Sequence, residues 1–175
     1  ITSTTDLDIE SRLKTLGDSN FASDFSVAFN NDLETAGDFN VYADRDGNGT
    51  GDITFAQNIV FSDSGNSLLL KSNDLVLGVE INNAASVYLI PSDGGNIGVG
   101  LATSDYTIDN QEFSLIEADV VVLGDNTSGN ITADGISLEE SADINQFTLD
   151  ATQAGKSITF ENNDLTFSSL RALAA

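Results

Sequence analysis

The sequence contains no cysteine, histidine, methionine or tryptophan, and its single proline is Pro91. Without cysteine and histidine there is no thiol nucleophile, no Ser-His pair, no zinc site built from the usual ligands and no disulfide bond. These absences exclude most of the common catalytic mechanisms. No apolar run is long enough for a membrane-spanning helix, so we expect no insertion into a membrane.

Basic residues are also scarce. Lys and Arg total 6 against 28 Asp and Glu, which gives a formal net charge of −22. Nucleic acids and anionic lipid surfaces are improbable partners because both would be repelled, and cations are the natural counter-charge. Charged residues are nevertheless only 19% of the chain and hydrophobic residues 40%. This balance indicates one folded acidic domain rather than a disordered acidic tail.

The chain is rich in short β-branched and aromatic segments separated by polar turns. Many segments are apolar-x-apolar triplets, such as Ile53-Thr54-Phe55, which place both apolar side chains on one face. The clearest series runs from Tyr106 to Leu138. A hairpin meander would favour tight Asn-Gly turns between longer strands, whereas these turns are irregular. We therefore predict an all-β fold, a parallel β-helix (solenoid) of about eight rungs with ~22 residues each.

The first residues fit this pattern least well. The apolar positions between Leu7 and Leu16 fit either a half-buried strand followed by a turn or one short helix that ends at Gly17. We assign residues 1–20 to an irregular or edge segment that joins the solenoid, and residues 21–175 to the β-helix repeat section. Neither end offers a clear cap, so we expect uncapped ends and a section of a longer chain or fibre.

Several segments carry a family resemblance. Residues Glu112–Ala118, Val120–Asp125 and Ser128–Thr132 together resemble a repeat of large filamentous-haemagglutinin-like exoproteins. Residues Ala43–Phe55 and Ser157–Leu165 are similar to other segments of the same proteins. The resemblance implies a right-handed β-helical passenger that is exported by two-partner secretion. It also implies an adhesin or fibre located outside the cell or on the bacterial surface.

The sequence also departs from this family. The resemblance covers most of the chain from Phe39 to Ala175, and its motifs are degenerate. The Asn-Pro motifs of the family's amino-terminal secretion domain are missing, because the only proline, Pro91, follows Ile90. The export route is therefore an inference from the resemblance alone.

One Gly-rich turn has the composition of a calcium loop, with acidic or amide oxygens at alternating positions. The candidate ligands are Asp44, Asp46, Asn48 and Asp52. The turn opens like an EF-hand loop but departs from it at Gly51, where that loop has an aliphatic residue, and at Phe55, where it has a bidentate Glu. A flexible polar turn explains the same residues. Calcium is the only cofactor that the sequence suggests, and the fold requires none.

These features favour a non-enzymatic structural or adhesive module. We expect it to stack end to end with copies of itself or adjacent repeats, and to contact host or matrix glycans or proteins. The alternative is a carbohydrate-binding or carbohydrate-degrading β-helix that uses paired carboxylates. Five carboxylates are candidates for that chemistry, and the sequence singles out none: Asp134, Glu139, Glu140, Asp143 and Asp150. Aromatic platforms for sugars are few, since the chain has three Tyr and no Trp.

Overall fold

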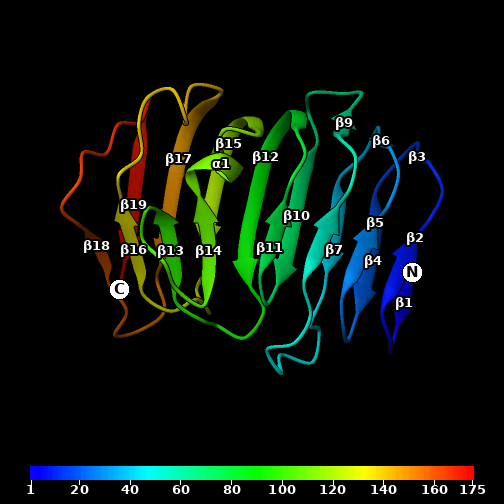
Figure 1. The fold of residues 1–175 in the computed structure, drawn as a ribbon, viewed down its shortest axis with the longest axis horizontal. Coiled ribbons are helices and arrows are strands. Elements are labelled where there is room, and N and C mark those ends of the chain that lie inside the picture. Colours follow the sequence, from blue (N-terminus) through cyan, green and yellow to red (C-terminus); the bar gives the residue numbers. More distant parts are fainter.

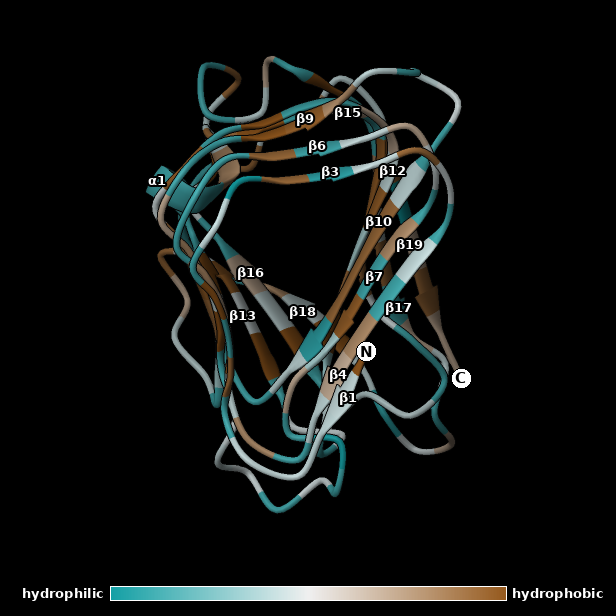
Figure 2. Cartoon of the chain, turned by 90° about the vertical axis from the view of Figure 1, so that its right-hand side faces the viewer, coloured by the Kyte–Doolittle hydropathy of each residue, from teal (hydrophilic) through white to brown (hydrophobic).

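The computed structural model describes residues 1–175, which form a parallel β-solenoid of about eight rungs (Figure 1). Viewed from its amino-terminal end, the chain runs clockwise as it recedes, so the solenoid is right-handed (Figure 2). Each rung follows three faces in turn. All strand pairs between rungs are parallel, as the short triplets and irregular turns predict.

The first face holds one strand of every rung. Its strands, in spatial order, are β1 (Thr2–Ser3), β4 (Ser19–Ser23), β7 (Phe39–Tyr42), β10 (Ser67–Ser72), β12 (Ile81–Pro91), β15 (Ile116–Gly124), β17 (Ile144–Ala151) and β19 (Leu170–Ala174). The third face begins with β3 (Leu13–Thr15), β6 (Leu33–Thr35) and β9 (Ile59–Phe61). It joins the first face because β12 pairs with β9 before it bends to pair with β10.

The second face is divided into two four-stranded sheets. The first sheet contains β2 (Leu7–Ile9), β5 (Val27–Phe29), β8 (Ile53–Phe55) and β11 (Leu75–Leu77). The second sheet contains β14 (Tyr106–Asp109), β13 (Ile97–Gly100), β16 (Ile131–Asp134) and β18 (Ile158–Phe160). Strand β13 precedes β14 in the chain but pairs with β16, whereas β14 lies on the side of β11. After β13 the chain reverses along the solenoid axis, so that β14 lies between β13 and the first sheet of this face.

Residues 1–20 form the first rung, which differs from the irregular segment expected there. Strands β2 and β3 pair with β5 and β6 in a constant register of 20 residues, as Leu7↔Val27 and Leu13↔Leu33 show. The short-helix alternative is wrong, because the apolar residues before Gly17 lie on two separate strands. Strands β1, β2 and β3 each pair on one side only.

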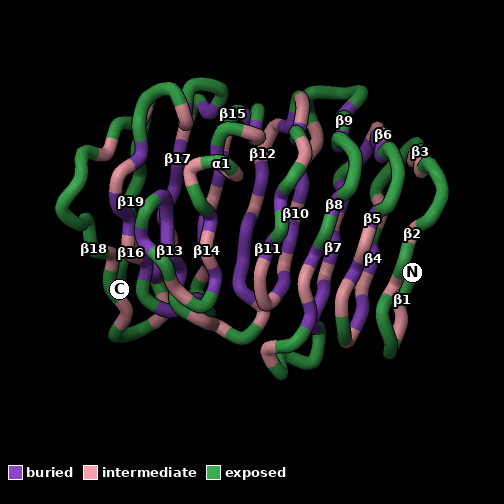
Figure 3. The backbone as a smooth tube through the Cα atoms, viewed as in Figure 1, coloured by how far each residue is buried: buried purple, intermediate pink, exposed green.

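The core fills the inside of the solenoid. A single cluster of 35 buried hydrophobic residues runs along it, and buried positions alternate with exposed ones along the strands (Figure 3). The apolar side chains stack in columns; on the second face, Leu7, Val27 and Ile53 follow one another in register. Each triplet buries its outer two residues because their neighbours in adjacent rungs bury the same positions.

Regular helix is almost absent. The single short helix, α1 (Asn110–Phe113), lies between β14 and β15. Asp109 caps it by accepting a hydrogen bond from the Glu112 backbone N–H, and the Glu112 side chain accepts one from the Asp109 N–H in return. No helix has the length and apolar character needed to cross a membrane.

Candidate functional site

The turn predicted to bind calcium is organised around a buried carboxylate. Asp44 is only 1% exposed and adopts a left-handed backbone conformation with φ of 51°. Its side chain accepts hydrogen bonds from the backbone N–H groups of Asn48 (2.9 Å) and Gly49 (3.0 Å) and from the Ser92 hydroxyl. Asp44 therefore closes the turn through internal hydrogen bonds and ties it to the strand end at Ser92.

The other candidate ligands have partners of their own. Asp46 accepts a hydrogen bond of 2.8 Å from the Asn48 side-chain amide, and Asp52 accepts one of 3.3 Å from that of Asn73 in the next rung. No group of three or more acidic side chains is close enough together to hold a metal ion. A Cβ at Gly51 would lie 2.4 Å from the Asp44 backbone nitrogen, which explains why the larger residue of a calcium loop does not fit there. Calcium binding at this turn stays a prediction.

An acidic groove lies where the chain passes from the third face to the first. It has a volume of about 420 Å³ and is lined by Glu117, Asp119 and Asp143, with Asn83 and Asn145 beside them. The groove forms at an irregularity in the pairing of β12 with β15 between Ile81 and Ala84, within which Asn83 has a φ of 65°. This backbone irregularity pushes the strand outward and leaves room between neighbouring rungs.

The groove contains only one of the five carboxylates proposed for carbohydrate chemistry, Asp143. Asp134 is buried and accepts three hydrogen bonds from Asn163, so its role is structural. Glu140 accepts a hydrogen bond from the Ser137 backbone N–H, and Asp150 accepts two from Thr152. Their positions do not pair them across one site.

Sequence reasoning missed the two carboxylates that do share the groove with Asp143. Glu117 and Asp119 alternate with buried residues along β15, so both side chains point out of the same face. This alternation was visible in the sequence. Their approach to Asp143 was not visible, because it depends on how β15 and β17 stack in register.

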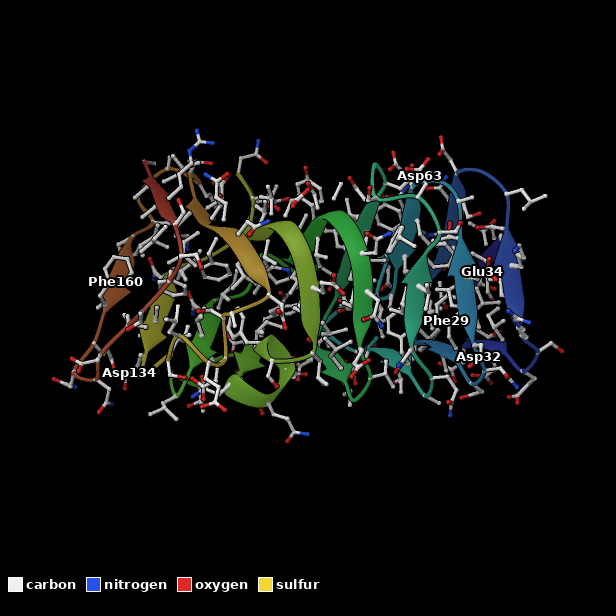
Figure 4. All side chains as sticks on the ribbon, turned by 90° about the horizontal axis from the view of Figure 1, so that it is seen from above. Phe29, Asp32, Glu34, Asp63, Asp134 and Phe160 are labelled. Carbon is white, nitrogen blue, oxygen red and sulfur yellow. The ribbon has the colours of Figure 1, made fainter.

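Both ends of the described chain present strands with one neighbour. At the amino-terminal end these are β1, β2 and β3, and at the carboxyl-terminal end β18 and β19. Apolar side chains remain exposed there, including Phe160 at 47%, which projects from the terminal rung in Figure 4. As expected for uncapped ends, no helix or loop within residues 1–175 covers either terminal rung.

A seam divides the second face between β11 and β14. Neither strand pairs with the other, because β11 pairs only with β8 and β14 only with β13. Two carboxylates bridge them instead. Glu112 accepts a hydrogen bond of 3.0 Å from the Leu77 backbone N–H, and Asp74 accepts one of 3.4 Å from the Thr107 N–H.

Burial perturbs the acidic groups of this seam. It raises the pKa of Glu112 to about 7, and the nearby Asp109 and Asp74 carboxylates add to the shift, against hydrogen bonds from Leu77 and Asp109 that lower it. Burial also raises the pKa of Asp74, with a smaller contribution from the Asp52 carboxylate. The seam is therefore a place where loss of a proton brings negative charges together.

Two hydroxyl groups near the seam lack partners. The Tyr106 hydroxyl on β14 and the Ser72 hydroxyl at the end of β10 lie near each other inside the solenoid but do not reach hydrogen-bond geometry. Burial raises the pKa of Tyr106 well above its usual range. Unsatisfied buried hydroxyls destabilise a fold, so the packing at this level is less favourable than elsewhere in the core.

Comparison with known proteins gave no match. No protein-family model, curated protein or solved structure matches the chain. The fold is established by the structure, and the resemblance to filamentous-haemagglutinin-like exoproteins stays a prediction.

Proposed function

We propose that the chain is a non-enzymatic section of an extracellular bacterial fibre or adhesin, displayed on the cell surface or released. The observation that carries this proposal is the pair of open terminal rungs, whose parallel strands offer unpaired backbone groups and exposed apolar side chains to further rungs of the same kind. Copies of the chain or adjacent repeats supply those rungs end to end. Such stacking builds a fibre when the operation does not close.

The rest of the molecule supports a structural role. Parallel backbone ladders and columns of apolar residues connect the rungs into a rod, and a formal charge of −22 favours solubility. Salt bridges contribute little to this rod, because the three present lie near its amino-terminal end and involve exposed basic side chains. The outer surface is left for contacts with host or matrix glycans or proteins.

Electron microscopy of the purified native protein tests the proposal. We expect rods longer than one copy, with an axial repeat that matches the rungs of this chain. Discrete particles of one copy at every concentration would contradict it. A parallel sample with chelator tests calcium at the turn from Asp44 to Asp52, because rods that depend on bound calcium would shorten.

The acidic groove supports a second candidate function, carbohydrate binding or hydrolysis. Glu117, Asp119 and Asp143 place carboxylates along one open cavity, as such chemistry requires. Glycan-array binding and hydrolysis assays with the wild type and Asp143→Asn test it. Binding or turnover that is lost in Asp143→Asn, while the rods still form, would favour this candidate.

A further inference from the structure

The seam between β11 and β14 interrupts only one face of the solenoid. On the first face, β10 pairs with β12 without a break, from Ser67↔Ser86 to Ser72↔Pro91. On the third face, the start of β12, which follows β11, pairs with the start of β15, which follows β14, through Ile81↔Ile116. The rungs before and after the seam are therefore joined along two faces and separable along the other. This is the geometry of a hinge whose axis lies on the continuous faces.

The contacts across the seam are few and involve acidic side chains. Two main-chain N–H groups, of Leu77 and Thr107, donate to carboxylates from the opposite side. The groups that face Glu112 come from every neighbouring element: Asp109 from its own cap, Tyr106 from β14 and Asp74 from the turn before β11. No basic side chain contributes to the environment of Glu112. Charge on Glu112 is therefore opposed by its neighbours and by burial.

We propose that the seam between β11 and β14 is a proton-controlled hinge, which is closed when Glu112 is neutral and opens along the second face when Glu112 is charged. A neutral Glu112 keeps acceptors for the Leu77 and Asp109 N–H groups and removes its repulsion with Asp74 and Asp109. The hinge goes beyond the proposed structural function, because it gives the rod a bend that depends on pH.

The direction of the effect follows from the two states of Glu112. Its pKa is about 7 in the closed seam, whereas an open, solvated seam returns it towards the ordinary value of 4.5. The closed state thus binds the proton more tightly. The extra stability that the proton gives to the closed state is fully present below the ordinary pKa of 4.5. It is lost as the pH rises to about 7, and above that pH it does not change further.

Hydrogen–deuterium exchange on dilute monomer tests the hinge without reference to fibre formation. After correction for the intrinsic exchange rate, we expect the protection of the Leu77 and Thr107 amides to fall at least tenfold between pH 5 and pH 8. The internal reference is the Asp38 amide, which donates to the Asp18 carboxylate (3.1 Å) between two rungs whose strands are paired. Equal changes at Asp38 and Leu77, or no change at Leu77, would overturn the proposal.

Two variants separate the hinge from general charge effects. Glu112→Gln keeps the size of the side chain and removes its charge, so the protection of Leu77 should become independent of pH. Asp74→Asn leaves Glu112 and its helix cap intact and removes one repelling charge that raises the Glu112 pKa, so the fall in protection should shrink and move to lower pH. A wild-type pH profile at Leu77 in Asp74→Asn refutes the hinge even when Glu112→Gln does not fold.

Discussion

Phe29 shows how one side chain connects successive rungs. Its ring stacks on Phe55 of the next rung with centroids 5.0 Å apart, and it meets Phe21 and Phe39 edge-on at 5.3 and 5.6 Å. Figure 4 places it inside the rod. Aromatic pairs of this geometry add to the free energy gained by burial. This cluster therefore links the second and third rungs through their buried aromatic rings.

Replacement of Phe29 by alanine should destabilise the protein strongly. We expect Phe29→Ala to lower the free energy of unfolding by about 3–5 kcal/mol, because a cavity replaces a fully buried ring. The matched control is Phe160→Ala, which removes the same ring from an exposed triplet position and should cost less than about 1 kcal/mol. Urea denaturation followed by circular dichroism measures both. Similar losses in the two variants would contradict the packing described for Phe29.

Substitutions of Asp44 test whether internal hydrogen bonds hold the candidate calcium turn in its conformation. Asp44→Ala leaves the N–H groups of Asn48 and Gly49 without their acceptor and should cost about 1–3 kcal/mol. Asp44→Asn should cost less, because asparagine keeps one acceptor and tolerates the left-handed conformation. Asp46→Asn is the control, since Asp46 accepts only an exposed hydrogen bond from Asn48. Thermal unfolding without calcium should rank the three variants in this order.

Between rungs, stacked corners fix the register. Thr15 donates a hydrogen bond of 2.8 Å to Thr35 at the same corner of the next rung. After one further residue, each threonine is followed by a Gly-Asp pair, Gly17-Asp18 and Gly37-Asp38. The Asp18 carboxylate accepts the Asp38 backbone N–H, and the Asp38 carboxylate accepts that of Ser67 in the next rung. These side chains satisfy corner N–H groups that no strand pairs with. They explain why Asp and Asn are frequent where the chain turns.

The glycines of this corner provide a matched pair for a test. A Cβ on Gly37 would lie 2.3 Å from the backbone carbon of Gly17, whereas a Cβ on Gly17 would meet nothing within 4 Å. We expect Gly37→Ala to destabilise the protein by about 1–3 kcal/mol or more, since backbone atoms must move apart. Gly17→Ala should be neutral or slightly stabilising, because alanine reduces the freedom of the unfolded chain. Equal denaturation midpoints would show that the corner does not stack as described.

The strands were more predictable than their order. Triplets such as Ile53-Thr54-Phe55 and Leu75-Val76-Leu77 predict the buried columns, because alternation along a strand is a local property. The 20-residue register of the first rungs escaped detection, since later turns of different length, such as Asp44 to Asp52, obscure the period. No local sequence pattern predicts the reversed order of β13 and β14. That order depends on which neighbouring strand each one pairs with in the folded solenoid.

In the candidate sites too, local composition could be predicted from the sequence and long-range packing could not. Sequence reasoning identified the turn from Asp44 to Asp52 as a calcium loop or a flexible polar turn, but it did not predict that Asp44 is buried and accepts hydrogen bonds from backbone N–H groups. Burial of Glu112 could not be predicted, because it arises from the packing of α1 against a strand more than 30 residues away. Composition predicts how many acids there are, and only the fold decides which of them are desolvated.

At the scale of the whole molecule, charge is distributed unevenly. Residues 1–20 carry four acidic and two basic side chains, and residues 151–175 carry two of each. The remaining middle section has only Arg45 and Lys71 to offset all the other acids. Repulsion is therefore concentrated on the middle rungs, while the terminal rungs that would stack carry little net charge. This distribution supports end-to-end contacts and disfavours contacts along the sides.

Salt should separate general screening from specific cation binding. We expect the unfolding temperature to rise by a few degrees as NaCl is raised from about 10 to about 200 mM, because screening weakens the repulsion among the middle rungs. At equal ionic strength, magnesium and calcium should act alike if screening is the whole effect. A larger rise with calcium that disappears in Asp46→Asn would place an ion at the turn from Asp44 to Asp52. An unfolding temperature that does not respond to NaCl would mean that the acids are too far apart or too well solvated to oppose folding, and the charge of −22 would then affect solubility alone.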